Sequence, residues 1–252
     1  MVDNGLKSLD TRQKLPYNKH IQGVFLMAKI IAICGFIGSG KDTVADYLVN
    51  IHGFRRESFA NSLKDSVSAV FGWDRDMLEG RSKQSREWRE QVDPFWSARL
   101  KMPKLTPRWV LQYWGTEVVR KGFHDDMWVA SLENRLRKST DDIVITDCRF
   151  PNEIKAVKRI GGQIVCVTRG PEPEWYDDAK SMNKGPGRNM SWALSKHRIE
   201  ELGIHASETA WVGQKFDIIL DNNGTLDELY NQIEPLLKSQ EQDHLVASPA
   251  PL

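Results

Sequence analysis

The sequence predicts an α/β fold in which helices flank a parallel β-sheet, and three observations predict it. Residues 29–34 form a short run that is rich in β-branched residues and apolar on both faces, as a central parallel strand should be. A glycine-rich turn follows, and apolar residues then recur at helical spacing over 41–51. Residues 142–168 repeat the order strand, helix, strand. This alternation favours one parallel sheet.

Length and charge limit the classes of protein that the chain can represent. Its 252 residues suffice for one domain with an insertion. The 35 Lys and Arg nearly balance the 34 Asp and Glu, and 40% of the residues are hydrophobic. We therefore expect a soluble globular protein with neither a nucleic-acid nor a membrane partner. The three cysteines, Cys34, Cys148 and Cys166, are far apart in apolar runs, which predicts buried thiols and a cytoplasmic compartment.

The first part of the chain is expected to hold an arm, two strands and two helices. Residues 1–27 are polar and lack periodicity, so they predict a flexible arm, and Met27 offers a second possible start. The helix over 41–51 should end at Gly53. A short strand over 55–59 and a helix reaching Phe71 are expected next.

The middle of the chain predicts an insertion followed by two helices. Residues 72–106 are polar, carry several tryptophans and interrupt the α/β order. The helices are expected over 107–120 and 125–137.

The second half is expected to hold strands over 142–147, 163–168 and 216–220, and a helix over 151–160. Residues 170–203 are rich in Pro, Gly, Asn and Lys, which predicts a loop or flap instead of core. Thr225 and Glu228 form a capping-box pattern for a last helix that should run to about Leu237. The polar tail from Ser239 is expected to be disordered.

A phosphate-binding loop is the sharpest signal in the sequence. Gly35 to Lys41 matches the GxxxxGK pattern where a strand passes into a helix. Glycines let successive backbone N–H groups point at phosphate oxygens, and Lys41 can reach the outer phosphates. A glycine-rich turn without a ligand is the alternative. The order of strand, loop and helix, together with Asp147 at the end of another strand, favours nucleotide binding.

The residue after Lys41 departs from the usual Ser or Thr, because Asp42 stands there and Thr43 follows. Either side chain offers oxygen that Mg²⁺ prefers, and the sequence does not decide between them. We expect Mg²⁺ with ATP as co-substrate.

Transfer to a second polyanion requires further cations around the acceptor. The candidates are Lys64, Arg86, Arg108, Arg149 and Arg169. Each taken alone reads more simply as a solvated surface charge. Arg149 and Arg169 stand out because they follow predicted parallel strands, where ligands bind in open α/β sheets. With Lys41, they form the predicted catalytic set. Gly115 within a helical pattern suggests a close approach by a base or phosphate.

The motifs in their order resemble those of the tailed-phage deoxynucleoside monophosphate kinases. The residues that carry the resemblance are Gly38-Ser39-Gly40-Lys41-Asp42-Thr43, Leu63-Lys64-Asp65, Gln112 to Thr116, Trp128, Thr146 to Arg149, His205 to Glu208 and Asp217 to Leu226, within about 29–237. The resemblance implies a P-loop kinase fold over 28–238 with an acceptor-binding segment at about 55–120 and a lid at about 170–205. It also implies MgATP as donor, deoxynucleoside monophosphates as acceptors for DNA precursor synthesis, a homodimer, and the cytoplasm of an infected host cell.

The resemblance also assigns binding residues by motif position. The ATP site would consist of Phe36, Ile37, Gly38, Ser39, Gly40, Lys41, Asp42 and Thr43. The acceptor site would consist of Lys64, Arg86, Arg108, Gly115, Thr116, Trp128, Asp147, Arg149 and Phe150. Phe150 and a longer lid depart from the family pattern. Phe150 suggests stacking on the base, and hence a broad choice of base.

Two other readings remain open from the sequence. A kinase of another small phosphorylated substrate, such as a phosphomevalonate kinase, also carries a GKD-type loop. A nucleotide-dependent switch would use the same loop to drive a partner protein, although the balanced charge and the predicted lid argue against it.

Overall fold

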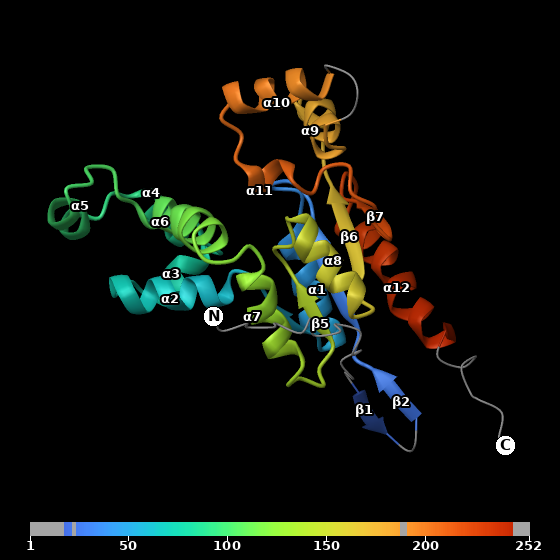
Figure 1. Ribbon diagram of the computed structural model, residues 1–252. Helices are drawn as coiled ribbons and strands as arrows, with labels where there is room; N and C mark the ends of the chain where they lie inside the picture. Colours follow the sequence, from blue (N-terminus) through green and yellow to red (C-terminus); the bar gives the residue numbers. More distant parts are fainter. Residues whose placement is uncertain (1–17, 22–23, 187–190, 244–252) are drawn as a thin grey trace, which may run out of the picture.

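The computed structural model describes residues 18–21, 24–186 and 191–243, and it confirms the predicted fold class. Five parallel strands form one sheet in the order β4-β5-β3-β6-β7 (Figure 1). Their bounds are β3 Ile30–Cys34, β4 Arg55–Glu57, β5 Ile143–Ile145, β6 Gln163–Thr168 and β7 Ile218–Asp221. Every residue of β3 and β5 is buried, which explains why both runs are apolar on both faces.

Two layers of helices cover the sheet. The first layer consists of α1 (Lys41–His52) and α12 (Leu226–Asp243), whose apolar residues pack with Ile31 and Ile33 of β3. The opposite layer includes α7 (Met127–Leu136) and α8 (Pro151–Arg159), which pack with Ala32 and Cys34 of the same strand. Because residues alternate along a strand, the two faces of β3 supply the two core clusters. The three cysteines are buried and free, as predicted.

The predicted insertion, residues 72–106, is helical and belongs to a larger helical segment, residues 61–121, which has a core of its own and is called the insertion from here on. This segment contains α2 (Asn61–Phe71), α3 (Arg75–Glu79), α4 (Lys83–Glu90), α5 (Pro94–Leu100), α6 (Pro107–Tyr113) and a π-helix, η1 (Trp114–Lys121). Val67, Trp73, Leu78, Leu105 and Val110 form the buried centre, and other tryptophan rings pack around it. Of the tryptophans in residues 72–106, Trp73 is buried in this core, and Trp88 and Trp96 are partly buried against it. Figure 1 shows the insertion projecting to one side of the sheet.

The prediction of a loop over 170–203 is wrong, because two helices occupy much of this segment. They are α9 (Tyr176–Asn183) and α10 (Ser191–Glu201), which lie beyond the end of β6 (Figure 1). Ala179 and Ile199 are buried between or beneath them, and the buried Ser195 donates to Asp178 Oδ1 at 2.7 Å. Ala179 and Ile199 belong to the main core, and Trp175, Tyr176 and Met182 pack against it, so the segment contributes to the core. Pro, Gly, Asn and Lys separate these apolar residues, which weakens the sequence signal.

The two ends of the described chain also differ from the prediction. Strands β1 (Asn18–Ile21) and β2 (Val24–Met27) form an antiparallel hairpin within the predicted arm. The capping box at Thr225 is confirmed, because Thr225 and Glu228 exchange side-chain to backbone hydrogen bonds of 2.7 and 3.3 Å. Helix α12, however, continues past Pro235 to Asp243. The rest of the predicted tail, and residues 1–17 of the arm, lie outside the described residues.

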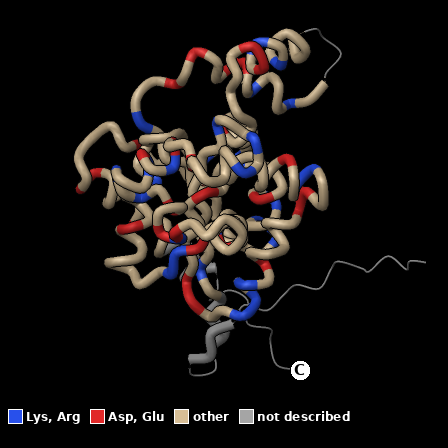
Figure 2. The backbone as a smooth tube through the Cα atoms, turned by 90° about the vertical axis from the view of Figure 1, so that its left-hand side faces the viewer, with Lys and Arg blue, Asp and Glu red and all other residues tan. Residues whose placement is uncertain are grey.

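Charged residues of both signs are spread over the described chain. Figure 2 shows Lys and Arg interspersed with Asp and Glu, in keeping with the net charge of +1. No helix of the described part is long and apolar enough to cross a membrane.

Candidate functional site

The loop between β3 and α1 has the backbone that a phosphate cradle needs. Gly35, Gly38 and Gly40 have φ angles of 142°, 79° and 101°, which L side chains rarely adopt. A Cβ at Gly35 would lie 2.4 Å from the carbonyl oxygen of Val167. A Cβ at Gly40 would lie 2.2 Å from Asn222 Nδ2. This Nδ2 donates to the carbonyl oxygen of Ser39 at 2.8 Å. The neighbouring strands therefore fix the shape of the loop and require these glycines.

Lys41 lies folded over this loop. Its Nζ donates to the carbonyl oxygens of Gly35 and Phe36 at 2.8 and 2.6 Å. Burial lowers the pKa of Lys41, and nearby Arg149 lowers it further, whereas Glu208 and Asp42 oppose the shift. Two cations thus lie close together in a partly buried place. Phosphate oxygens would relieve this repulsion and replace the two carbonyl partners of the ammonium.

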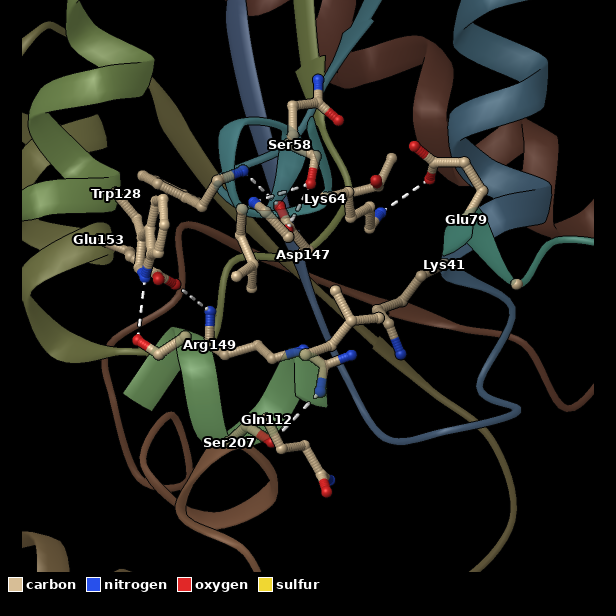
Figure 3. A pocket seen from close by; sticks show the side chains of 18 of the residues that line it. Lys41, Ser58, Lys64, Glu79, Gln112, Trp128, Asp147, Arg149, Glu153 and Ser207 are labelled. Atoms are coloured by element: carbon tan, nitrogen blue, oxygen red, sulfur yellow. Dashed lines mark hydrogen bonds and ion pairs between the residues drawn. The ribbon is translucent and has the colours of Figure 1, made fainter. Parts of the chain in front are cut away.

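A cavity of about 690 Å³ opens between the loop and the insertion. Most of the predicted site residues line it, and Figure 3 shows Lys41, Lys64 and Arg149 around the same space. The predicted residues in its wall are Ile37, Gly38, Lys41, Asp42, Lys64, Arg86, Gly115, Thr116, Trp128, Asp147, Arg149 and Phe150.

Six predicted residues lie outside this wall: Phe36, Ser39, Gly40, Thr43, Arg108 and Arg169. The Phe36 ring packs against Trp175 and Trp211, with centroids 5.5 and 4.6 Å away. Arg108 pairs with Glu90 at 3.2 Å, and Arg169 is exposed just beyond the end of β6. Phe36 thus has a packing role against two tryptophans, and Arg108 already has a carboxylate partner.

Asp147 lies in the cavity wall, but both of its carboxylate oxygens already accept hydrogen bonds from other residues of the chain. It accepts hydrogen bonds from Ser58 Oγ at 2.5 Å and from the backbone N–H groups of Phe59 and Ala60 at 2.9 and 3.0 Å. These bonds fix the turn that leads into α2. In the free protein, Asp147 therefore positions the helix that carries Lys64.

Trp128 and Gly115 hold each other in the wall of the cavity. The indole Nε1 of buried Trp128 donates to the carbonyl of Gly115 at 3.0 Å. A Cβ at Gly115 would lie 2.9 Å from Leu63 Cδ2, so the close approach expected at this glycine is made by Leu63. Gly115 also lies in η1, and π-helical turns are rare and frequent at functional sites. Because the Trp128 indole N–H already donates to Gly115, Trp128 could contact a nucleotide base only through the face or edge of its ring.

Arg149 connects the sheet to the short helix α11 (Ala206–Thr209). Its Nη1 donates to Glu208 Oε1 at 3.1 Å and lies 3.4 Å from Ser207 Oγ. Below it, the backbone N–H groups of Arg149 and Phe150 both donate to Glu153 Oε2, at 2.8 and 3.0 Å. Hydrogen bonds thus hold Arg149 both at its backbone N–H and at its guanidinium group.

Arg120 and Glu153 are functional candidates that the sequence did not reveal. Both are buried in the cavity wall, where Arg120 donates to Glu153 and its Cζ lies 4.1 Å from the centre of the Phe150 ring. Burial raises the pKa of Glu153 to about 7, although Arg120 opposes this shift. The two residues are 33 positions apart, and each reads as an ordinary helical charge, so no local pattern connects them.

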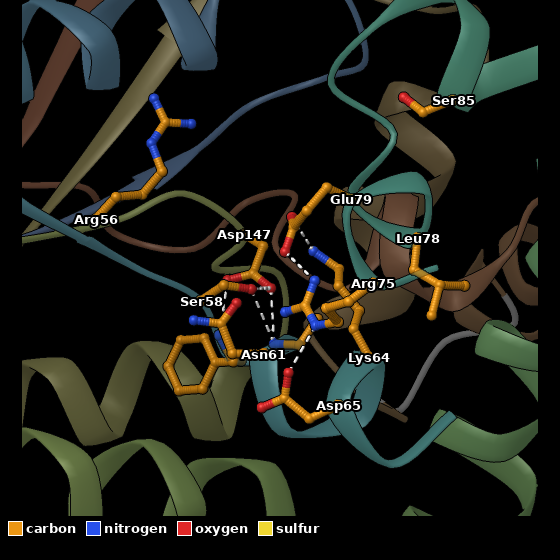
Figure 4. Close-up of polar contacts among 12 residues, drawn as sticks. Arg56, Ser58, Asn61, Lys64, Asp65, Arg75, Leu78, Glu79, Ser85 and Asp147 are labelled. Atoms are coloured by element: carbon orange, nitrogen blue, oxygen red, sulfur yellow. Dashed lines mark hydrogen bonds and ion pairs between the residues drawn. The ribbon is translucent and has the colours of Figure 1, made fainter. Parts of the chain in front are cut away.

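Lys64 belongs to a second charge network, on the insertion. Lys64 Nζ donates to Glu79 Oε2 at 2.7 Å. Arg75 donates to the other carboxylate oxygen of Glu79, and it also donates to Asp65 Oδ1 at 2.6 Å (Figure 4). Burial alone would raise the pKa of Glu79, but Lys64 and Arg75 outweigh it and lower the pKa to about 2. The network fixes Lys64 across the gap between α2 and α3.

The low pKa of Glu79 predicts a pH-dependent contribution to stability. In the unfolded chain the carboxyl has its ordinary pKa of 4.5, so the contribution is present above that pH and is lost as the pH falls toward 2. We expect Glu79→Gln to lower the free energy of unfolding at pH 6 by roughly 3 kcal/mol or less, with a smaller loss at pH 3.5. Urea unfolding at both pH values measures this.

The matched control for Glu79→Gln is Glu87→Gln. Glu87 is exposed on α4, where it pairs with exposed Lys83 at 3.7 Å, so its replacement should change stability little. A loss in Glu79→Gln that is equal at pH 6 and pH 3.5 would contradict the prediction.

The start of α1 fits an ion that is bound mainly by phosphates. The Asp42 side chain is largely exposed, and Oδ1 accepts from Arg56 Nη1 at 3.0 Å, while Thr43 stands beside it. Among the described residues, no group of three or more His, Cys, Asp or Glu side chains could hold a metal. Mg²⁺ in phosphoryl-transfer sites uses one or two carboxylates together with substrate phosphates, so Asp42 and Thr43 are a suitable donor pair.

Two curated proteins are similar to this chain over most of its length. The first is a protein of Acanthamoeba polyphaga mimivirus, provisionally named a deoxynucleotide monophosphate kinase. It is 29% identical over 219 residues, which cover 81% of this chain and 93% of the relative. The second is the deoxynucleoside-5'-monophosphate kinase of Escherichia phage T5, 28% identical, covering 84% of this chain and 100% of the relative. The resemblance predicted from the motifs is confirmed.

The other two comparisons add little. No protein-family model matches the chain. Among solved structures, TT1252 from Thermus thermophilus aligns with 84% of this chain and 97% of its own, at 18% identity and a TM-score of 0.41. A gluconokinase from Sinorhizobium meliloti 1021 aligns with 87% of this chain and 98% of its own, at 15% identity and a TM-score of 0.38. At these TM-scores the likeness adds nothing to the fold already described.

Proposed function

We propose that this protein transfers the γ-phosphoryl group of ATP to deoxynucleoside 5'-monophosphates and so produces deoxynucleoside diphosphates. One observation carries the proposal. The glycine cradle with Lys41 shares a cavity with Lys64 of α2, Arg86 of α4 and Arg149 of the connection between β5 and α8. A cradle alone would suit any nucleotide-binding protein, whereas cations facing it from the insertion suit a second phosphate. The similarity to the two viral relatives supports the same activity.

The reaction needs positioning and charge neutralisation more than proton transfer. An oxygen of the acceptor phosphate is already anionic, so it can form the new bond to the γ-phosphorus while the bond to the β,γ-bridging oxygen breaks and ADP leaves. Lys41 would bind the transferring group, and Arg149 would hold the acceptor phosphate in a bidentate grip. Bound Mg²⁺ supplies further neutralisation of phosphate charge, with Asp42 and Thr43 as the residues that would hold it.

Broad base tolerance is part of the proposal. Phe150 lines the cavity and presents one face to the Arg120 guanidinium. A ring supported in this way can stack on any base, because every base has a π-face, and stacking does not read the hydrogen-bonding edge. We expect all four deoxynucleotides to be accepted. Steady-state kinetics that showed a single accepted base would contradict this part alone.

A coupled ADP-release assay tests the proposed activity. The assay would contain MgATP and each of dAMP, dGMP, dCMP and dTMP, with the matching ribonucleotides and an acceptor-free blank as controls. Turnover with deoxynucleotides and a low blank are expected. ADP release that needs no acceptor would favour a nucleotide-dependent switch, and release only with another small phosphorylated substrate would favour a different kinase.

Arg149→Ala should weaken the acceptor more than the donor. We expect the KM of the deoxynucleotide to rise about 10- to 100-fold, because a charged hydrogen-bonding partner of the phosphate is removed. The matched control is Arg159→Ala, since Arg159 is exposed on α8 outside the cavity wall. An unchanged acceptor KM in Arg149→Ala would remove this residue from the acceptor site.

We also propose a homodimer that acts in the cytoplasm of an infected host cell. The phage and mimivirus origins of the relatives support the setting. Static light scattering behind a sizing column tests the dimer, and a mass of one chain would contradict it.

A further inference from the structure

Arg89 on α4 is a partly buried cation of the cavity wall that makes one long hydrogen bond and no ion pair among the described residues. It lies one turn beyond Arg86, and both residues line the cavity. Its Nη1 is 3.5 Å from the carbonyl oxygen of Leu78, a long hydrogen bond. Its Nε is buried and has no hydrogen-bond partner among the residues that the structure describes. A guanidinium carries five N–H donors, and buried donors without partners are rare in folded proteins.

The chain reserves space for this guanidinium by placing glycine at position 80. Gly80 follows α3 with a φ of 69°, and a Cβ there would lie 2.0 Å from Arg89 Nη2 and 2.1 Å from its Cζ. The planar head of Arg89 therefore lies directly against the Gly80 backbone. Both residues are part of the cavity wall, so the head is held at a defined place beside the cavity.

The charges around Arg89 leave it without a carboxylate of its own. Burial lowers its pKa, and Arg108 lowers it further, while Glu90 and Glu79 oppose the shift. Glu90 already pairs with Arg108 at 3.2 Å, and Glu79 already binds Lys64 and Arg75. A half-buried cation among other cations is unfavourable until an anion arrives, which makes this place a prepared anion site.

We propose that Arg89, seated against Gly80, binds the phosphate group of the acceptor nucleotide. The inference rests on the proposed function and adds to it a residue that the motifs did not indicate. The motif positions pointed to Arg86 and Arg108, yet Arg108 lies outside the cavity wall and has a carboxylate partner. Arg89 lines the same cavity as Lys41 and Arg149. A phosphate bound by Arg89 would therefore lie in the same cavity as the phosphoryl group that is transferred.

The test compares Arg89→Met with Arg99→Met. Arg99 is an exposed arginine on α5 of the same insertion and lies outside the cavity wall, so it controls for the loss of one charge. Titration calorimetry would use the full chain with dTMP, with thymidine and with ATP. In Arg89→Met we expect the Kd of dTMP to rise about 10- to 100-fold, with the Kd values of thymidine and ATP unchanged. Arg89→Lys should lie between wild type and Arg89→Met, because it keeps the charge and loses the fork.

Thermal unfolding separates a binding role from a structural one. If Arg89 is held ready for an anion, its removal relieves repulsion, and the Tm of Arg89→Met should stay the same or rise. Unchanged dTMP affinity in Arg89→Met would overturn the proposal. A loss confined to ATP would assign the residue to the donor and would also overturn it. If Arg89→Met does not fold, unchanged dTMP affinity in Arg89→Lys has the same meaning.

The failure of the proposed function gives a different result. Wild-type protein that binds and phosphorylates none of the four deoxynucleotides would remove both the function and the acceptor role of Arg89. If the wild type phosphorylates deoxynucleotides and the Arg89 variants bind dTMP as tightly as the wild type does, the proposed function stands and only the acceptor role of Arg89 is removed.

Discussion

Replacing Lys41 by alanine should reduce kcat at least about 10²- to 10³-fold, the range seen when one preorganised group that stabilises developing charge is removed. The ammonium lies against the glycine loop, where its Nζ donates to two loop carbonyls. In the reaction those carbonyls would give way to phosphate oxygens. Alanine leaves the cradle N–H groups intact, so the affinity for ATP should fall much less than turnover. Single-turnover kinetics with saturating MgATP measure the chemical step directly.

Arg86→Ala is the matched comparison for Lys41→Ala. Arg86 also lines the cavity, but it is exposed and its Nη1 donates only to the carbonyl of Arg81, at 2.7 Å, among the described residues. Its loss should raise the acceptor KM with a much smaller change in kcat. Circular dichroism and a melting curve would show that both variants fold. Lys41→Ala with kcat within a few-fold of wild type would refute the assignment of Lys41.

The fold was predictable because its decisive signals are local. Residues 30–34 and 143–145 are buried on both faces and therefore read as continuous apolar runs. Gly53 ends α1 with a φ of 71°, as the sequence indicated. Residues 170–203 were misread because Pro, Gly, Asn and Lys separate their apolar residues, although Ala179 and Ile199 lie in the main core.

The positions of the candidate site residues were predictable only where a local pattern marks them. Lys41 follows glycines whose spacing is itself the motif, and Arg149 follows a buried strand. Arg89 carries no such mark, because its importance comes from contact with Gly80, nine positions earlier, and from carboxylates that other residues have already engaged. Arg108 looked equivalent in sequence, yet the fold gives it a partner outside the cavity wall. Which cation is left without a carboxylate partner is a property of tertiary structure.

Arg120→Met should cause the largest loss of stability among the site variants. Arg120 is 7% exposed and Glu153 is 3% exposed, so removal of the guanidinium leaves a buried carboxyl whose main charged partner is gone. Breaking one side of a buried pair typically costs about 3–5 kcal/mol. The loss should also disturb the backbone of Arg149 and Phe150, since both N–H groups donate to Glu153. Urea unfolding at pH 8 measures the effect.

The pH dependence of this loss identifies its cause. Burial already raises the pKa of Glu153 to about 7 from an ordinary value of 4.5, and without Arg120 the pKa should rise further. The folded variant then holds a proton that the unfolded chain releases above pH 4.5, so its stability falls as the pH rises, and the deficit relative to wild type should be larger at pH 8 than at pH 6.

The double variant Arg120→Met/Glu153→Gln provides the decisive comparison. Glutamine removes the buried charge, while its carbonyl oxygen can still accept from the Arg149 and Phe150 backbone. We expect it to recover about half or more of the stability that Arg120→Met loses at pH 8. The fall in stability between pH 6 and pH 8 that residue 153 causes in Arg120→Met should be absent from the double variant, because glutamine does not titrate. A double variant that is no more stable than Arg120→Met at pH 8 would show that the loss comes from packing of Arg120 on Phe150 instead of from the uncompensated carboxylate.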